Sequence, residues 1–196
     1  MIYFINNKKF VVKMFEQNKK LVLDKKDKSP IGRIDERIKE LLDIINKNPN
    51  YYTTSSCSGR IVLIDGEKKG ESTWRFVSHE NVSYDEVKSN LKGLNVWFRC
   101  EPMILHIASK DLSSAFKLVN LARNLGFRRS GIQSKNKLII EISSSEILDT
   151  ILIKNGVLLI DDNYLSVLVD EANKKLRKTW DKIEKLKNLM VDIDEI

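Results

Sequence analysis

Apolar residues recur at spacings of three and four in several stretches of the chain, and this period predicts amphipathic helices. In the N-terminal arm, Phe10, Met14 and Phe15 follow a candidate N-cap at Asn7 and predict a short helix. Further helices are predicted over residues 33–47, 84–91, 111–125 and 162–190. The residues expected to face inward are Ile34, Ile38, Leu41, Leu42 and Ile45 in the first of the three longer helices, Leu112, Ala115, Phe116, Val119 and Ala122 in the second, and Leu165, Leu168, Val169, Ala172, Leu176, Trp180, Ile183, Leu186 and Met190 in the third.

Short segments rich in β-branched and aromatic residues lie between these helices and predict strands. These strands cover residues 51–54, 60–64, 73–78, 96–108 in two pieces broken at Pro102, 127–132 and 138–142, with a small polar turn over residues 55–59. Because short turns connect many of the segments, we predict an α/β fold of the α+β type, with a mixed, largely antiparallel sheet and a long C-terminal helix.

The order helix, aromatic-led strand, serine-containing turn and apolar strand occurs twice, over residues 33–64 and 111–142. The segment YYTTSSCSGRIVLI of the first stretch corresponds to FRRSGIQSKNKLIIEI of the second, which indicates an internal duplication. We expect residues 1–28 to form a basic N-terminal helix or arm, and residues 29–196 to form a single α/β domain.

The composition is that of a folded protein, because 42% of the 196 residues are hydrophobic and 31% are charged. No apolar run approaches the roughly 18 residues of a membrane span, and lysines interrupt the apolar start of the chain, so neither a membrane span nor a secretory signal is expected. Cys57 and Cys100 form no CxxC pair and no disulfide framework, which predicts a reducing, cytoplasmic location.

The formal net charge is +7, and residues 1–28 alone carry eight lysines against three acidic residues. A positive field of this kind concentrates polyanions, of which nucleic acid is the commonest. The alternative is that a lysine-rich surface serves solubility alone. Charge therefore points to RNA or DNA without deciding the matter.

The segment TTSSCSGR, residues 53–60, is the most unusual part of the chain. Turns of small residues expose backbone N–H groups, Gly59 allows close approach of a ligand, and Arg60 can hold a carboxylate or phosphate through two hydrogen bonds. The alternative is an ordinary hairpin turn of serine and glycine. No GxG occurs in the chain, so any nucleotide-like ligand is expected to bind outside a Rossmann framework.

Two further chemistries are conceivable for the cysteines. Cys57 as a nucleophile needs a base beside it, and neither His79 nor His106 is tied to it by sequence. A zinc site made from Cys57, His79, Cys100 and His106 has suitable ligand types, but the four occur singly, without the paired spacing of structural zinc sites. We therefore expect no metal.

Other polar residues stand at strand ends, where binding residues are common. His79 follows one strand, and Glu101 closes the piece before Pro102. Arg129 and Ser130 occupy the matching place in the second half and are expected to converge on the same cleft. His106 lies inside an apolar strand, where a hydrogen-bonded core histidine is the alternative to a binding role.

Several motifs together resemble a known family. They are SPIGRID (29–35), YYTTSSCSGRIVL (51–63), WRFVSHE (74–80), RCEPMILHI (99–107), GFRRSGI (126–132) and YLSVLVDEANKKL (164–176). In this order they are similar to the tRNA wybutosine-synthesizing methyltransferase family, archaeal type, whose members methylate N4 of a wyosine-type base. The resemblance covers nearly the whole chain from Ser29 onward.

The resemblance implies S-adenosyl-L-methionine as methyl donor and the anticodon loop of phenylalanine tRNA as substrate. The residues it implies for the methyl donor are Ser55, Ser56, Cys57, Ser58, Gly59 and Arg60, and those for the substrate are His106, Arg129 and Ser130. The chain departs from the family pattern at Ser143, where an arginine is usual, at Ile151 for a proline and at Thr179 for an asparagine.

Methyl transfer to a ring nitrogen is an in-line displacement that gains most from alignment, with help from a general base. We predict Glu101, His79 or Asp35 as that base, in this order. Two other functions stay open from the residues alone: an RNA-binding protein without catalysis, and a hydrolase that depends on Cys57.

Overall fold

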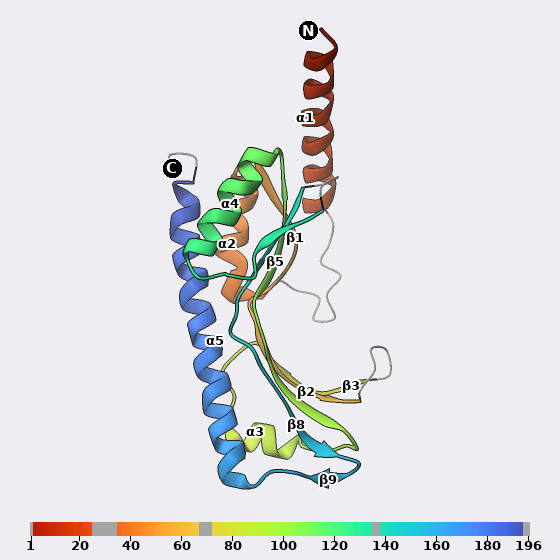
Figure 1. The fold of residues 1–196 in the computed structure, drawn as a ribbon, viewed down its shortest axis with the longest axis vertical. Coiled ribbons are helices and arrows are strands. Elements are labelled where there is room, and N and C mark those ends of the chain that lie inside the picture. The colour runs from red at the N-terminus through yellow and green to blue at the C-terminus, as the bar shows by residue number, and fades with distance from the viewer. Residues whose placement is uncertain (1, 25–34, 67–71, 135–137, 194–196) are drawn as a thin grey trace.

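The computed structural model describes residues 2–24, 35–66, 72–134 and 138–193. Its helices are α1 (Ile2–Leu23), α2 (Glu36–Lys47), α3 (Tyr84–Ser89), α4 (Leu112–Asn124) and α5 (Asp162–Val191). Its strands are β1 (Tyr51–Cys57), β2 (Arg60–Asp65), β3 (Thr73–Ser78), β4 (Val96–Glu101), β5 (Ile104–Ser109), β6 (Gly131–Ser134), β7 (Ile139–Ser143), β8 (Leu148–Lys154) and β9 (Val157–Leu158). Figure 1 shows them arranged along one long helix, α5.

The strands form two antiparallel sheets. Sheet A has the order β1-β5-β7-β6, and sheet B has the order β3-β2-β4-β8-β9. The mixed α/β architecture, the antiparallel pairing and the long C-terminal helix are therefore as the sequence predicts. The strand material is divided between two sheets rather than gathered in one.

Three strands of sheet A connect directly to three strands of sheet B. β1 leads into β2 through Ser58 and Gly59, β4 leads into β5 through Pro102 and Met103, and β7 leads into β8 through residues 144–147. Each of these strands therefore bends rather than turns back on itself. Sheet A lies above this bend and sheet B below it, in the orientation of Figure 1.

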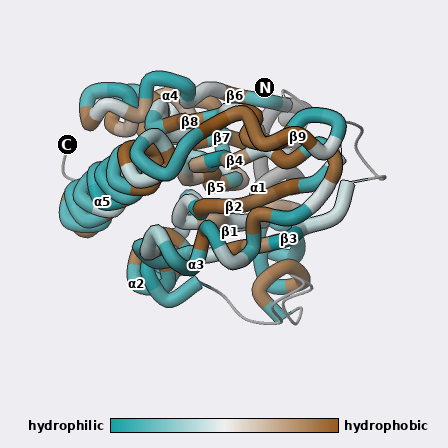
Figure 2. The backbone as a smooth tube through the Cα atoms, turned by 90° about the horizontal axis from the view of Figure 1, so that it is seen from below, coloured by the Kyte–Doolittle hydropathy of each residue, from teal (hydrophilic) through white to brown (hydrophobic). Residues whose placement is uncertain are grey.

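Two hydrophobic cores lie between the sheets and the helices. The core of sheet A packs against α2, α4 and the second half of α5, whereas the core of sheet B packs against α3 and the first half of α5. Trp180 of α5 packs against both cores. In Figure 2 the tube is largely brown, for hydrophobic residues, along β2 and β8, whereas much of α5 is teal, for hydrophilic residues.

The N-terminal helix contacts the other face of sheet A. The rings of Phe15 in α1 and Tyr52 in β1 lie 5.1 Å apart, and Val22 and Ile139 complete a small third cluster. The rest of α1 extends past the end of the sheet (Figure 1). The predicted short helix in the arm is thus part of a helix of 22 residues.

The structure corrects several local predictions. The segment over residues 55–59 is not a turn, because β1 continues to Cys57 and the chain bends only at Ser58 and Gly59. Leu112 and Phe116 do not face the core, because each is 52% exposed. Leu118, which is not among the residues predicted to face inward, is buried in α4. Residues 127–130 precede β6 rather than forming its first part, and residues 25–34 and 67–71 lie outside the described ranges.

The two segments expected to be duplicated differ in their pairing. β6 and β7 pair as an antiparallel hairpin, whereas β1 and β2 lie in different sheets. The helix that precedes each pair packs on sheet A in both cases. Among the described residues, no helix is both long enough and apolar enough to cross a membrane.

Leu176 of α5 is 1% exposed and packs in the core of sheet B beside the bend. We expect Leu176→Ala to lower the free energy of unfolding by about 2–5 kcal/mol, because truncation leaves a cavity in a closed core. Val167→Ala on the same helix, at a position that is 57% exposed, is the matched control and should cost little. Urea unfolding of both variants measures the difference, and equal losses would contradict the assigned packing.

Candidate active site

The bend between β1 and β2 is held by the carboxylate of Asp35, the N-cap residue of α2. One oxygen of this carboxylate accepts the backbone N–H of Arg37 at 3.1 Å, which caps the helix. The other oxygen accepts the Ser58 backbone N–H at 3.2 Å and also the Ser58 hydroxyl. Ser58 is completely buried, so a single anion joins the start of α2 to the bend.

His79, just after β3, completes this cluster. Its Nδ1 lies 3.1 Å from the Asp35 carboxylate, 3.1 Å from the Gly59 carbonyl oxygen and 3.9 Å from the Cys57 sulfur. The hydrogen bond to Asp35 is the main cause that raises the pKa of His79 from 6.5 to about 10. At neutral pH the ring is therefore a cation that donates hydrogen bonds.

Asp35 is the matching anion. Burial alone would raise its pKa, but the hydrogen bonds from His79, Ser58 and Arg37 outweigh burial, so that its pKa is lowered from the usual 3.8. The carboxylate therefore stays ionised, with its oxygens occupied by these donors. Asp35 and His79, both predicted as candidate bases, form a fixed ion pair at the bend.

The loop after His79 is fixed by helix α5. The buried side chain of Asn173 accepts the Val82 backbone N–H at 2.9 Å and donates to the Val82 carbonyl at 2.8 Å. Arg177 donates to the Asn81 side chain at 3.2 Å. On the other side of the loop, Glu80 forms an ion pair with Arg37 of α2 at 2.5 Å. The position of His79 is thus set from two helices.

Arg60 and Glu101 are directly opposite each other at the ends of β2 and β4. Their side chains form an ion pair at 2.6 Å, and each is about 30% exposed, at 30% and 28%. The Arg60 guanidinium also lies 4.3 Å from the ring centre of Trp74, which is 46% exposed. An arginine, a carboxylate and an exposed indole therefore share one surface of sheet B.

A bulge in β1 determines which side chains of the serine-rich segment lie on the face of sheet A that carries His106. The register moves by one residue between Thr53 and Ser55, so that Ser55 pairs with His106. Ser55 Oγ lies 2.8 Å from His106 Nδ1, and His106 Nε2 lies 3.2 Å from the Glu141 carboxylate on β7. His106 is therefore a partly exposed, hydrogen-bonded residue and not a core histidine.

The predicted ligand segment divides into two groups. Ser55 and Cys57 stand on one face of β1, whereas Ser56 pairs with Leu105, a residue of the sheet A core. Ser58 and Gly59 are buried, and a Cβ atom at Gly59 would lie 3.2 Å from both the Glu101 carbonyl oxygen and Leu176. Gly59, at φ +98°, thus allows the bend and its packing, and we revise the expectation that it makes room for a ligand.

The residues predicted in the second half have different surroundings. Ser130 is buried, donates to the Phe127 carbonyl at 2.7 Å and accepts the Ser143 backbone N–H at 3.3 Å. It therefore stabilises the α4–β6 connection, and Arg129 beside it is exposed. Ser143, where the family pattern has an arginine, is itself buried.

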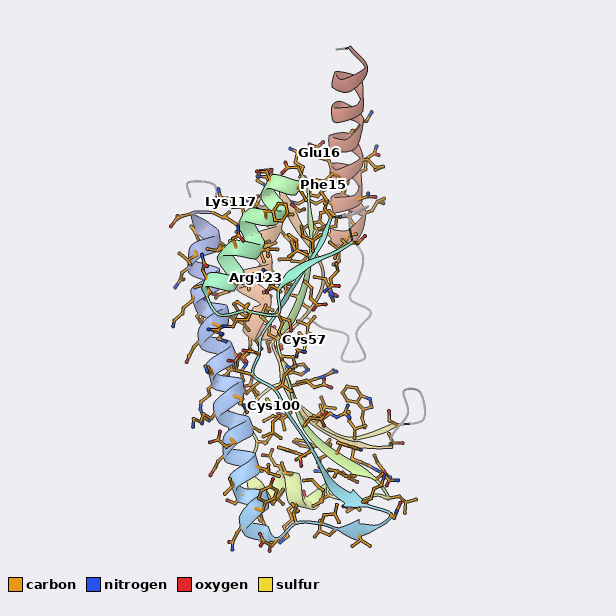
Figure 3. The ribbon with its side chains drawn as sticks, viewed as in Figure 1. Phe15, Glu16, Cys57, Cys100, Lys117 and Arg123 are labelled. Carbon is orange, nitrogen blue, oxygen red and sulfur yellow. The ribbon has the colours of Figure 1, made fainter. Side chains whose placement is uncertain are left out.

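The two cysteines differ in exposure. Cys57 is partly exposed at the bend, whereas Cys100 is buried and its thiol lies 3.7 Å from the Ala172 carbonyl of α5 (Figure 3). Burial raises the pKa of Cys100 to about 11. Among the described residues, no group of three or more His, Cys, Asp or Glu side chains is placed to hold a metal ion.

A groove of about 510 Å³ lies on the α5 side of the molecule, next to Arg37. It is lined by Arg37, Lys174, Arg177, Lys178, Trp180, Asp181 and Glu184. The Arg37 guanidinium lies 4.0 Å from the ring centre of Trp180. Because Arg37 also bonds Glu80, this mainly basic groove adjoins the loop that carries His79.

The family described as methyltransferase TYW3 matches residues 7–192. The chain belongs to this family. The match includes the bend with its cluster around Asp35 and His79, the Arg60–Glu101 pair and the side chains of Ser55, His106 and Glu141. The protein is thus a methyltransferase, as the resemblance implies.

Curated relatives agree with this assignment. A protein from Pyrococcus furiosus, named tRNA(Phe) 7-((3-amino-3-carboxypropyl)-4-demethylwyosine(37)-N(4))-methyltransferase 1, is 41% identical over 173 residues, which cover 84% of this chain and 87% of the relative. A relative from Archaeoglobus fulgidus with the corresponding name is 39% identical, covering 81% and 83%. The tRNA wybutosine-synthesizing protein 3 homolog of Danio rerio is 35% identical, covering 87% and 72%.

Solved structures share the fold. A protein from Pyrococcus horikoshii superposes with a TM-score of 0.83 at 37% identity, over 91% of this chain and 97% of that chain. A protein from Aeropyrum pernix superposes with a TM-score of 0.75 at 29% identity, over 83% of this chain and all of that chain. The two-sheet arrangement is therefore the architecture of these relatives as well.

The Asp35–His79 pair predicts a specific dependence of stability on pH. Because the folded pKa of His79, about 10, lies above the ordinary 6.5, the protonated ring stabilises the fold fully below about pH 6.5, and this stabilisation is lost as the pH rises through 10. Asp35→Asn keeps a good N-cap but removes the anion, so the variant should lose less stability between pH 7 and 10.

The free energy of unfolding in urea, measured at several pH values, tests this dependence. Asp43→Asn, which changes an exposed carboxylate on the same helix, serves as the control and should follow the native protein. Identical pH profiles for Asp35→Asn and the native protein would contradict the ion pair.

Proposed function

We propose that the protein transfers a methyl group from S-adenosyl-L-methionine to N4 of a demethylwyosine-type base at position 37 of phenylalanine tRNA. The observation that carries this proposal is the similarity to relatives named for that reaction, at 41% identity over 173 residues that cover most of both chains. The net charge of +7 supports an RNA substrate.

The charged groups at the bend suit the methyl donor. S-Adenosyl-L-methionine carries a carboxylate, an ammonium, a positively charged sulfur and an adenine ring. When bound it supplies a methyl group, and its sulfur then becomes a neutral thioether. Arg60 would hold the carboxylate through its guanidinium, Glu101 would face positive charge, and the exposed indole of Trp74 offers a stacking surface. Ser55 and Cys57 would line the side of this region formed by β1.

The three residues predicted as general base differ in their surroundings. His79 is protonated at neutral pH and therefore donates hydrogen bonds instead of accepting a proton. Asp35 is occupied by Ser58, Arg37 and His79. Glu101 holds Arg60 through one carboxylate oxygen, and we propose that its first task is to keep that guanidinium in place over Trp74.

The basic groove beside α5 is a candidate contact for the phosphate backbone of the tRNA. Four of its lining residues are cations and two are acids, and it adjoins the loop that carries His79. Lysine and arginine contacts to phosphates supply affinity without reading sequence. We therefore propose that this groove positions the tRNA while the bend holds the reacting groups.

Transfer of labelled methyl from S-adenosyl-L-methionine to tRNA lacking the N4 methyl group tests the reaction. We expect Glu101→Gln to raise KM for the methyl donor about tenfold, because the charge that fixes Arg60 is lost, which corresponds to about 1.4 kcal/mol. Asp149→Asn removes the carboxylate of another arginine pair in the same sheet and should leave KM unchanged.

Two outcomes would count against these assignments. Unchanged turnover and KM in Glu101→Gln would remove Glu101 from the site. RNA binding by the native protein without label transfer would mean that the protein is a binding protein rather than an enzyme for this base.

Charge reversal in the groove tests the tRNA contact. The double variant Lys174→Glu/Lys178→Glu should raise KM for tRNA. The slope of log KM against the logarithm of the salt concentration should also become smaller, by about 0.7–0.9 for each phosphate that is no longer bound. It should leave KM for the methyl donor unchanged. Lys117→Glu/Arg123→Glu on α4 (Figure 3) makes the same change in charge away from the groove. Equal effects of both double variants would assign tRNA binding to overall charge alone.

A further inference from the structure

Ser55, His106 and Glu141 lie side by side on three neighbouring strands. Ser55 of β1 pairs with His106 of β5, and His106 pairs with Glu141 of β7. Residues directly opposite each other in antiparallel strands project from the same face, so the three side chains form one row. The row is joined by contacts of 2.8 Å from Ser55 Oγ to His106 Nδ1 and 3.2 Å from His106 Nε2 to Glu141.

The direction of these hydrogen bonds follows from their chemistry. An ionised carboxylate only accepts hydrogen bonds, so Glu141 accepts the Nε2–H of His106. Nδ1 of the neutral ring is then an acceptor, and the Ser55 hydroxyl donates to it. The Ser55 oxygen keeps lone pairs for a further group, and its proton has an acceptor already in contact.

The stability of the sheet does not explain the row. Ser55 is exposed, and the side chains of His106 and Glu141 are 31% and 27% exposed, where hydrogen bonds and ion pairs add little to stability. The bulge next to Thr53 interrupts the ladder of hydrogen bonds, and as a result Ser55 stands on this face. Bulges are common next to active sites, so this bulge favours a functional role for the Ser55 hydroxyl.

Space beside the row is also preserved. Gly131 of β6 stands directly opposite Glu141, and a Cβ atom built there would meet no atom of the described residues within 4 Å. On the other side, Ile104 next to Cys57 is 37% exposed. A planar base can therefore approach the row from the side of sheet A that faces away from α2, α4 and α5.

We propose that the row Ser55–His106–Glu141 is the proton acceptor of the methyl transfer, a role that rests on the proposed function. As the accepting nitrogen forms its bond to the methyl carbon and the carbon–sulfur bond breaks, the N–H proton passes to Ser55 Oγ and the Ser55 proton passes to His106 Nδ1. The electron pair of the N–H bond stays on the nitrogen. Glu141 stabilises the resulting imidazolium.

This assignment fits the state of the other candidates. His79 carries a proton at neutral pH, Asp35 is saturated with donors, and Glu101 binds Arg60. Ser55 lies two residues before Cys57 on the same face of β1, and Arg60 follows just after the bend. The acceptor and the methyl-donor residues therefore belong to one continuous segment of chain.

The kcat of variants in the row tests the proposal. Besides Glu141 on β7, the Cys57 thiol on β1 is an ionisable group on this face, and α1 covers the other end of the face through Phe15. Under the proposal kcat depends on a neutral His106 ring, because only a neutral ring can accept the Ser55 proton. Glu141→Gln should lower kcat, because the carboxylate that lies 3.2 Å from His106 Nε2 and stabilises the imidazolium is gone.

His106→Ala should lower kcat by about 10²- to 10⁴-fold, while KM for the methyl donor changes little. Added imidazole should restore part of the activity, which a purely structural histidine would not allow. Glu40→Gln, an exposed carboxylate of α2 that pairs with Lys187, is the matched control for Glu141→Gln. Urea unfolding of each variant checks that the fold is retained.

The results separate this proposal from the proposed function. Absence of methyl transfer in the native protein would overturn the function itself. Methyl transfer by the native protein, together with a His106→Ala variant whose kcat is unchanged or does not respond to imidazole, would overturn the row alone. A loss of kcat in Glu101→Gln together with an unchanged kcat in His106→Ala would assign the proton acceptor to Glu101.

Discussion

The two-residue bend at Ser58 and Gly59 is the constraint on which the rest of the structure depends. Gly59 adopts a left-handed backbone conformation that a side chain would strain, and it packs against Leu176 and the Glu101 backbone. Ser58 binds the carboxylate that caps α2, and the Gly59 carbonyl binds His79. One short segment therefore sets the angle between the sheets, the start of a helix and the position of a charged histidine.

The arrangement separates fixed charges from accessible ones. The ion pair of Asp35 and His79 is saturated by hydrogen bonds within the protein, so it maintains the geometry of the bend. Arg60, Glu101 and Trp74 on sheet B, and Ser55 and its partners on sheet A, keep exposed surface. Polar side chains are thus accessible on both sheets, while hydrogen bonds from Asp35 and His79 hold the connection between the sheets. Such preorganisation suits a transfer whose rate depends chiefly on alignment.

Periodicity in the sequence predicts α2, α4 and α5 well, because each buries a continuous stripe, as the residues from Leu165 to Met190 of α5 do. It fails for Leu112 and Phe116, because spacing alone does not say which side of a helix meets the sheet. The bulge that turns Ser55 outward depends on pairing with a strand 50 residues away, which no local pattern encodes. The sequence does carry a signal for Glu141, which is the single charged residue of β7 and stands between Ile140 and Ile142. Asn173 and Thr179 are the corresponding polar exceptions on the buried stripe of α5.

The long helix α5 contributes to both cores, and Trp180 packs against each of them. Neither sheet can lose its packing without exposing part of the same helix, so the two halves of the molecule are expected to melt together in a single cooperative transition. Unfolding intermediates with one intact sheet should therefore be scarcely populated. The loop that carries His79 is joined to the middle of the same helix through the hydrogen bonds between Asn173 and Val82.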